Sequence, residues 1–198
     1  MCEDDPLRVA AAILRGGCAA LQLRDKRSDD RAFAQLGSAL QQLCEGAAVP
    51  FIVNDRFWLA REIGAYGVHI GQSDALLETV RREVGNTTSL GLSTHSLAQA
   101  SEAELRGADL IGFGPVFGTT SKVDADPIVG IETLATVCAR ASIPVVAIGG
   151  VSLERADLVA GAGAPLAAAI SALCKAPDPE EAARSLHARL RVGSQSRR

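Results

Sequence analysis

The chain has 198 residues, which is the size of a single domain with a sizeable core. Apolar residues make up 47% of it and aromatic residues only 4%, a balance that suits close helix-on-sheet packing better than a β-sandwich. The net charge of -3 provides no basic surface for nucleic acid, so we expect no nucleic-acid partner.

The cysteines and the N-terminal residues bear on the compartment. The five cysteines are odd in number and widely spaced, and they include no C-x-x-C pair, so we expect neither a zinc site nor a disulfide framework. The acidic start (Glu3, Asp4, Asp5) is unlike a secretory or transit peptide, and no apolar run approaches the ~20 residues of a membrane span. We predict a cytoplasmic protein without membrane contact, and the sequence leaves open whether it forms a homo-oligomer.

Short apolar runs alternate with longer stretches of helical character along the chain. The predicted strands cover residues 19–23, 51–53, 67–70, 89–92, 110–113, 145–148 and 166–170. A predicted helix precedes the first strand, at residues 7–14, and one follows each strand, at 30–44, 56–63, 75–84, 98–106, 131–139, 154–160 and 179–190. This alternation predicts right-handed βαβ units and a parallel sheet.

Two parallel architectures fit the alternation, and the position of the polar residues favours one of them. No G-x-G-x-x-G dinucleotide loop is present, and polar residues follow the C-terminal end of nearly every strand, as in barrel enzymes. We therefore predict an α/β fold of the (βα)8 TIM-barrel type. Because we count seven strands and the chain starts with a helix, we expect this barrel to lack its first β-strand. Residues 1–192 would form the single domain, and residues 193–198 a disordered polar tail.

The segment Leu21-Gln22-Leu23-Arg24-Asp25-Lys26 ends the first strand in charge. On a strand, Gln22, Arg24 and Lys26 point to one face, because side chains alternate between faces. Burying two cations costs free energy unless an anion meets them. Either this face binds a phosphate or pyrophosphate, or Arg24 and Lys26 have left the strand for solvent.

Two aspartates end consecutive strands. Asp55 follows Asn54, and Asp74 ends the segment His69-Ile70-Gly71-Gln72-Ser73-Asp74. Each carboxylate could simply cap the next helix. Adjacent strands lie about 4.8 Å apart, however, so the pair could also share one hard cation, and two carboxylates with phosphate oxygens and water are a usual Mg²⁺ arrangement.

Phosphate-binding chemistry follows the later strands. Ser93 could donate a hydrogen bond to a ligand or cap a helix. The loop after Phe113 carries hydroxyl groups and a cation suited to phosphate, but it could also be a plain solvated turn. Gly149 and Gly150 between a strand and a helix allow backbone N–H groups to approach an anion, and Ser171 follows the last strand. We interpret His69 as a core residue rather than a base.

Together these motifs resemble the thiamine phosphate synthase family over residues 9–171. The resemblance rests on ordered motifs: Gln22-x-Arg24-x-Lys26, Asn54-Asp55, the His-x-Gly-Gln-x-Asp segment ending at Asp74, Gly-x-Ser-Thr-His at 91–95, Gly-Pro-x-x-x-Thr-x-Thr-Lys at 114–122, and Ile-Gly-Gly at 148–150. Ser121 departs from the pattern by replacing the second threonine.

The resemblance implies a transferase that couples a hydroxymethylpyrimidine diphosphate to a thiazole phosphate, with Mg²⁺. It implies that the pyrimidine diphosphate is held by Gln22, Arg24, Lys26, Asn54, Ser93 and Lys122, of which Arg24, Lys26, Ser93 and Lys122 are the catalytic candidates. It also implies Asp55 and Asp74 as metal ligands, and Thr119, Thr120, Ser121, Gly150, Ile170 and Ser171 as the thiazole phosphate site.

Two other functions remain as alternatives. A thiazole tautomerase of the same superfamily would need a proton-transfer residue, which Pro115 and Val116 do not supply, and would have no diphosphate to bind. A non-catalytic paralogue that binds phosphorylated ligands is the second alternative, and the absent first strand motivates it.

Overall fold

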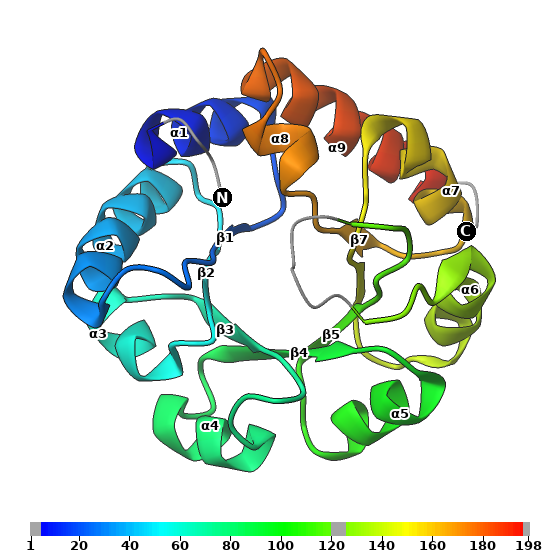
Figure 1. The fold of residues 1–198 in the computed structure, drawn as a ribbon, viewed down its shortest axis with the longest axis horizontal. Helices are drawn as coiled ribbons and strands as arrows, with labels where there is room; N and C mark the ends of the chain where they lie inside the picture. Colours follow the sequence, from blue (N-terminus) through cyan, green and yellow to red (C-terminus); the bar gives the residue numbers. More distant parts are fainter. Residues whose placement is uncertain (1–4, 120–125, 196–198) are drawn as a thin grey trace.

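The computed structural model describes residues 5–119 and 126–195, with side chains described up to residue 191. Seven parallel strands form one sheet in sequence order, and each pairs with its neighbours along the chain. The strands are β1 (Leu21–Leu23), β2 (Phe51–Asn54), β3 (Gly67–Ile70), β4 (Ser89–Thr94), β5 (Leu110–Phe113), β6 (Val145–Ala147) and β7 (Leu166–Ala167). The sheet curls around a central axis into a half-barrel (Figure 1).

Helices follow the strands and surround the sheet on its outer side (Figure 1). They are α1 (Pro6–Gly16), α2 (Asp30–Gly46), η1 (Phe57–Leu59), α3 (Ala60–Ile63), α4 (Leu77–Val84), α5 (Leu97–Leu105), α6 (Gly130–Arg140), η2 (Leu153–Arg155), α7 (Ala156–Gly161), α8 (Ser171–Cys174) and α9 (Pro179–Gln195). Within the described ranges, no helix is both long and apolar enough to span a bilayer.

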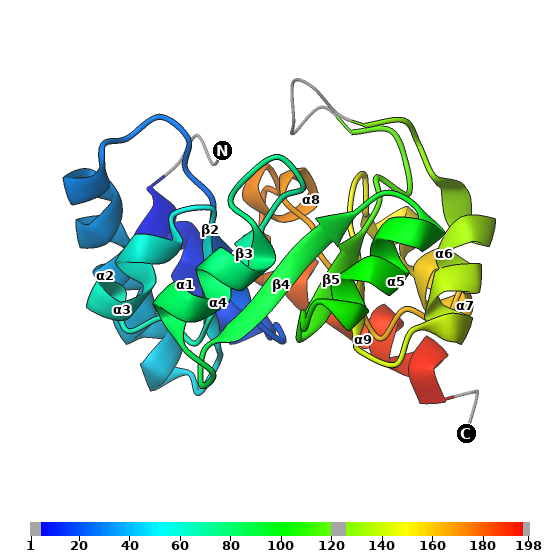
Figure 2. The ribbon, with the colours of Figure 1, turned by 90° about the horizontal axis from the view of Figure 1, so that it is seen from below.

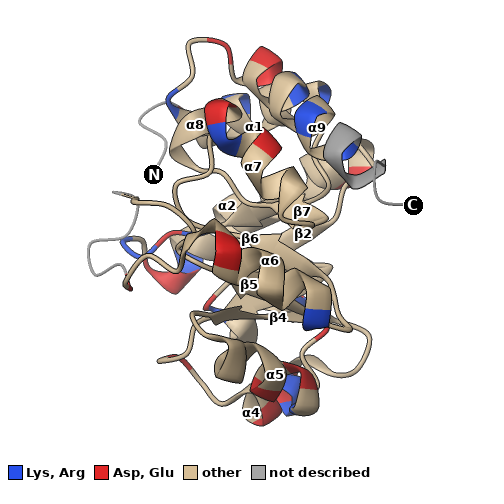
Figure 3. Ribbon diagram, turned by 90° about the vertical axis from the view of Figure 1, so that its right-hand side faces the viewer, with Lys and Arg blue, Asp and Glu red and all other residues tan. Residues whose placement is uncertain are grey.

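The core lies between the sheet and the helices. Alternate strand residues such as Val53, Ile70 and Leu90 are completely buried there. The opposite, inner positions of β3, β4 and β5 include Gly67, Gly91 and Gly112, which leave room inside the sheet for larger side chains. The strands carry no Lys, Arg, Asp or Glu, so the charged residues lie on helices and loops (Figure 3).

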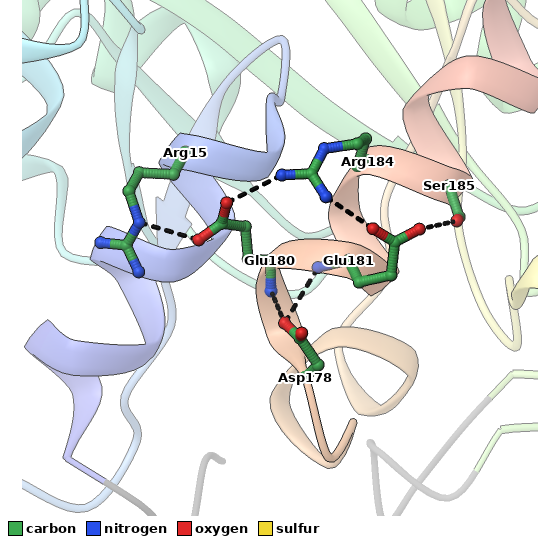
Figure 4. Close-up of polar contacts among 6 residues, drawn as sticks. All are labelled: Arg15, Asp178, Glu180, Glu181, Arg184 and Ser185. Atoms are coloured by element: carbon green, nitrogen blue, oxygen red, sulfur yellow. Dashed lines mark hydrogen bonds and ion pairs between the residues drawn. The ribbon is translucent and has the colours of Figure 1, made fainter.

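The two edges of the described sheet, β1 and β7, do not pair, and helices cover that side. Helices α1 and α9 pack closely there, because Gly16 carries no side chain: a Cβ at this position would lie 2.2 Å from the Glu180 carbonyl oxygen. Arg15 Nε lies 2.8 Å from Glu180 Oε2, and Arg184 also contacts Glu180 (Figure 4). The contact between α1 and α9 therefore closes the surrounding ring of helices at the position where β1 and β7 do not pair.

The structure confirms the expected parallel α/β architecture and corrects several local predictions. Strand β1 begins at Leu21 rather than at residue 19, and β7 ends at Ala167 rather than at residue 170. Helix α8 was not predicted. The tail was expected from residue 193, but α9 continues to Gln195. Cys174 is disulfide-bonded, which the cysteine spacing did not suggest.

Candidate active site

The candidate residues gather at one end of the half-barrel, where the strands end and the connecting loops begin (Figure 2). Parallel strands bring their C-terminal ends to the same edge, so residues far apart in sequence meet there. Lys122, Thr120 and Ser121 lie outside the described residues. Thr119 is the last described residue before them.

A tight double turn after β2 presents Asp55. The Arg56 N–H donates to the Asn54 carbonyl at 2.8 Å, and the Phe57 N–H donates to the Asp55 carbonyl at 2.8 Å, so two three-residue turns follow each other. Asp55 adopts φ 63°, a left-handed conformation that non-glycine residues rarely take. Such strain is concentrated at functional sites. Asp55 is therefore not a helix cap, and the structure excludes that interpretation.

Asn54 is buried beside Asp55 and keeps one polar atom unpaired. Its Nδ2 donates to Asp55 Oδ1 at 2.7 Å and to the His69 carbonyl at 2.9 Å. Its Oδ1 is buried and has no hydrogen-bond partner among the described residues. A buried acceptor without a donor is costly, so this oxygen indicates a place where a bound molecule can donate a hydrogen bond.

Asp55, Asp74 and Lys26 form a compact charge cluster. Burial and the facing Asp74 carboxylate raise the pKa of Asp55, while Lys26 acts in the opposite direction. Lys26 Nζ lies 3.3 Å from Asp55 Oδ2. Asp74 Oδ2 accepts the Gly71 N–H at 2.6 Å, and α4 begins only at Leu77, so Asp74 is not its N-cap.

The Asp55–Asp74 pair fits a divalent cation. Within the described part of the chain, no group of three or more His, Cys, Asp or Glu side chains is placed to hold a metal. Mg²⁺ commonly binds through one or two carboxylates and completes its coordination with phosphate oxygens and water. Two facing carboxylates, whose mutual repulsion a cation would relieve, match that donor set.

Gln22, Arg24 and Lys26 do not share one strand face in the structure. Strand β1 ends at Leu23, so Arg24 and Lys26 lie in the following loop rather than on one strand face. The Lys26 side chain is 56% exposed, and Arg24 is partly buried. Lys26 reaches the site by folding back to Asp55 rather than through strand alternation. Gln22 remains on β1, in register with Ile52.

Ser93 lies inside the sheet and contacts His69. Ser93 Oγ is 2.9 Å from His69 Nε2, and the Ser93 carbonyl accepts Gln72 Nε2 at 2.7 Å. Ser96, not Ser93, caps α5, because its Oγ accepts the Gln99 N–H. Burial lowers the pKa of His69 to about 4, against a smaller opposing effect of Asp74. The imidazole is therefore neutral near pH 7.

His69 contributes to the site more directly than the sequence indicated. A Cβ at Gly91 would lie 2.5 Å from His69 Nδ1, and one at Gly112 would lie 3.0 Å from its Cε1. Glycines on two adjacent strands thus make the space that the ring occupies. The sequence shows all three residues but not the register that joins them, which pairs His69 with Gly91.

The other side of the site is built from the loops after β5 and β6. Gly149 and Gly150 have φ values of 85° and 66°. A Cβ at Gly149 would lie 2.4 Å from Pro115 Cβ, and one at Gly150 would lie 2.5 Å from the Gly118 carbonyl oxygen. Only glycine fits this close approach of two loops.

Arg155 reinforces the contact between these loops. Its Nη1 donates to the Gly150 carbonyl at 2.8 Å, and its guanidinium lies 4.8 Å from the centre of the Phe117 ring. Ile170 and Ser171 follow β7, with Ser171 opening the four-residue helix α8 and Ile170 42% exposed.

His95 lies apart from the Asp55–Asp74 cluster. Its Nδ1 contacts the Gly114 carbonyl, and its Nε2 lies 3.3 Å from Asp126 Oδ2. His95 and Asp126 border a cavity of about 560 Å³ whose lining includes none of the predicted site residues. We therefore place the candidate site at the inner strand ends rather than in this cavity.

Comparison with known proteins identifies the family. The family model described as thiamine monophosphate synthase matches residues 1–173. The chain belongs to this family. It is 46% identical over 180 residues to the thiamine-phosphate synthase of Roseiflexus sp. (strain RS-1), covering 91% of this chain and 76% of that protein. It is 44% identical to the thiamine-phosphate synthase of Methanocella arvoryzae, covering 91% and 85%.

A solved structure of the same family agrees with the fold. The thiamine phosphate pyrophosphorylase from Pyrococcus furiosus has a TM-score of 0.89 and 32% identity, covering 96% of this chain and 91% of that chain. The structure of 3-hexulose-6-phosphate synthase also matches, with a TM-score of 0.66 and 19% identity, which shows a shared fold only. These matches confirm the family that the sequence motifs indicated.

Proposed function

We propose that this member of the thiamine monophosphate synthase family couples 4-amino-2-methyl-5-hydroxymethylpyrimidine diphosphate with 4-methyl-5-(2-phosphoethyl)thiazole, or its carboxylated form. The products are thiamine phosphate and pyrophosphate. The observation that carries the proposal is the Asn54–Asp55–Asp74–Lys26 cluster, in which two carboxylates, a cation and an unpaired amide oxygen meet. Relatives named thiamine-phosphate synthase support it over most of the chain.

The pyrimidine diphosphate would bind beside β1 to β4. Asp55 and Asp74 would hold Mg²⁺, which when bound supplies positive charge to the diphosphate leaving group. Lys26, Arg24 and Lys122 would neutralise the remaining charge as the CH₂–O bond breaks, because pyrophosphate carries about -3 to -4. Gln22, Asn54 and Ser93 would hold and orient this substrate through hydrogen bonds.

The thiazole phosphate would bind beside β5 to β7. Gly150 and the adjacent backbone form the tight loop there, and the proposed contacts are Thr119, Thr120, Ser121, Gly150, Ile170 and Ser171. The thiazole nitrogen attacks the electron-poor methylene, so the reaction needs no strong general base. The neutral His69 beside Ser93 agrees with that requirement.

The barrel and its cellular setting belong to the same proposal. The opening between β1 and β7 is where the eighth strand of a (βα)8 barrel would lie. A cytoplasmic location is part of the proposal: the thiols of Cys18 and Cys44 are free, which is typical of a reducing compartment, whereas Cys174 is disulfide-bonded.

A coupling assay tests the function directly. Purified protein is mixed with both heterocycles and Mg²⁺, and thiamine phosphate is measured with and without a chelator. We expect product that disappears when the metal is removed. Isomerised thiazole without coupling would instead identify a tautomerase, and binding without turnover would identify a non-catalytic paralogue. Either result would overturn the proposal.

A further inference from the structure

We propose that Arg56 is a positioning residue that holds the Lys26 loop, defined as residues 24–29, against the turn that carries Asp55. The proposal rests on the proposed function, because Lys26 and Asp55 are assigned there to the diphosphate and the metal. Arg56 belongs to none of the groups given a role above.

The Arg56 guanidinium binds three partners at once. Its Nη1 lies 3.0 Å from Asp30 Oδ1, its Nη2 donates to the Ser28 carbonyl, and its Cζ lies 4.7 Å from the centre of the Phe33 ring. The side chain is only 15% exposed. These contacts join the loop after β2 to the Lys26 loop and to the first turn of α2.

Adjacent residues of one turn hold the loop at two points. Asp55 contacts Lys26, and Arg56 contacts Ser28 and Asp30, which lie further along the same loop and at the start of α2. Between these points, Asp25 Oδ1 accepts the Arg27 N–H at 2.9 Å and the Ser28 N–H at 3.4 Å. Holding the Ser28 carbonyl in place therefore restricts the backbone position from which the Lys26 side chain extends.

Trp58 supports the same arrangement. Its Nε1 donates to Asp30 Oδ2 at 2.8 Å, so each Asp30 oxygen is used by one residue of the segment after β2. Asp30 is the first residue of α2, so its backbone belongs to the helix while its carboxylate contacts both Arg56 and Trp58. The planar guanidinium, which can stack on a ring while donating from its edge, suits these partners better than a lysine ammonium.

Lys26 depends on this support. Its side chain is more than half exposed, and it contacts the site through the 3.3 Å ion pair with Asp55. An exposed ion pair by itself orders a long side chain weakly. Without Arg56, we expect the loop to sample positions in which the Lys26 amine no longer faces the diphosphate.

Arg56→Gln is the main variant, and Arg56→Lys tests whether charge alone suffices. We expect Arg56→Gln to raise the KM for the pyrimidine diphosphate and the Mg²⁺ concentration needed for half-activity, each on the order of 10–100-fold. The KM for the thiazole phosphate should stay within about twofold. Arg56→Lys should rescue only part of the loss, because it keeps the charge but not the planar fork.

Arg81→Gln is the matched control. Arg81 is also a partly buried arginine that binds a carboxylate, Asp109, and backbone carbonyls, but it lies at the opposite ends of the strands. The Arg81→Gln variant should have a lower free energy of unfolding but an unchanged KM for the diphosphate. If Arg81→Gln and Arg56→Gln change that KM alike, the effect is general destabilisation and the positioning role is wrong.

Hydrogen exchange separates this proposal from the proposed function. Amide exchange is measured in the wild type and both arginine variants without substrates, so the result does not depend on turnover. We expect Arg56→Gln to speed exchange of the Arg27 and Ser28 amides, and Arg81→Gln not to. Unchanged exchange there would overturn the positioning role even in an active synthase. A wild type that makes no thiamine phosphate would overturn the function while leaving this measurement valid.

Trp58→Phe keeps the proposal testable if Arg56→Gln does not fold. It removes one hydrogen bond to Asp30 and leaves Arg56 in place. We expect a smaller rise, of about two- to fivefold, in the KM for the diphosphate, in proportion to one lost hydrogen bond. No change in that KM or in exchange of residues 24–29 would then contradict the proposal.

Discussion

The candidate site is made of side chains around β2 and β3 but of backbone around β5 and β6. On the first side, Asp55, Asp74 and Lys26 set the charge, and burial raises the pKa of Asp55. On the second side, Gly149 and Gly150 shape a loop with positive φ values and no room for a Cβ. The first side is therefore sensitive to charge, and the second to volume and backbone conformation.

The largest expected effect comes from changing charge on the first side. Asp55→Asn keeps the shape but removes a proposed metal ligand, so we expect turnover to fall on the order of 10²–10³-fold. Folding should be unimpaired or improved, because the raised pKa shows that the folded state disfavours the Asp55 carboxylate. Steady-state kinetics and thermal unfolding measure both effects.

Asp157→Asn is the control for that variant. Asp157 lies on α7, is well exposed and pairs with Arg189, far from the site in the fold. Its turnover should match the wild type. If Asp55→Asn also retains normal turnover, the side-chain half of the comparison is wrong.

The second prediction adds volume on the backbone side. Gly150→Ala introduces a Cβ where the Gly118 carbonyl oxygen would lie 2.5 Å away, at φ 66°. We expect destabilisation of about 1–3 kcal/mol and a raised KM for the thiazole phosphate, with the diphosphate KM little changed. Denaturant unfolding and kinetics with each substrate varied separate these effects.

Gly46→Ala is the contrasting glycine variant. Among the described residues, no atom beyond the chain neighbours and the helix's own backbone lies within 4 Å of a Cβ placed at Gly46, which is the last residue of helix α2. It should stabilise the protein by about 0.5–1 kcal/mol, because alanine favours the helix. A Gly150→Ala variant that behaves like Gly46→Ala would show that the loop contact does not constrain the site.

The third prediction uses the partly buried His69, which lies between the two sides. Its pKa of about 4 is below the unfolded value of 6.5, so the unfolded state binds more protons between these pH values. Stability should therefore rise with pH across this window, by on the order of 1–3 kcal/mol from this residue. In His69→Gln, the free energy of unfolding should change less with pH across this window. An unchanged slope would contradict the lowered pKa of His69.

The smallest effect is expected at the junction of α1 and α9. Glu180→Gln weakens the contacts with Arg15 and Arg184, which are surface ion pairs (Figure 4). Such pairs contribute little, so the melting temperature should shift slightly and the kinetics should not change. Altered substrate binding in this variant would mean that the junction influences the site.

Much of the fold follows from local sequence pattern. Apolar runs such as 67–70 and 110–113 match β3 and β5, because buried strands need continuous apolar residues. The start of β1, the end of β7 and the four-residue helix α8 differ from the prediction. Strand boundaries depend on pairing with neighbouring strands that lie far away in sequence, which local pattern does not record.

The sequence predicts which residues form the site, and their binding roles stay predictions. Asp55 and Asp74 were paired correctly as neighbours, because consecutive parallel strands end together. Of the two alternatives for Lys26, the structure bears out the one in which this residue leaves the strand, and it adds the ion pair with Asp55. The residues Lys122, Thr120 and Ser121 stay predictions outside the described part of the chain.

The sequence by itself determined the parallel α/β class and the family, and it predicted which residues bind phosphate and metal. It could do so because hydrophobic period and motif spacing are local properties of the chain. Only the tertiary structure decided that Asp55 adopts a left-handed turn, that His69 fills the space above two glycines, and that Arg56 ties together two loops. Each of these depends on register or packing between segments that only folding brings into contact.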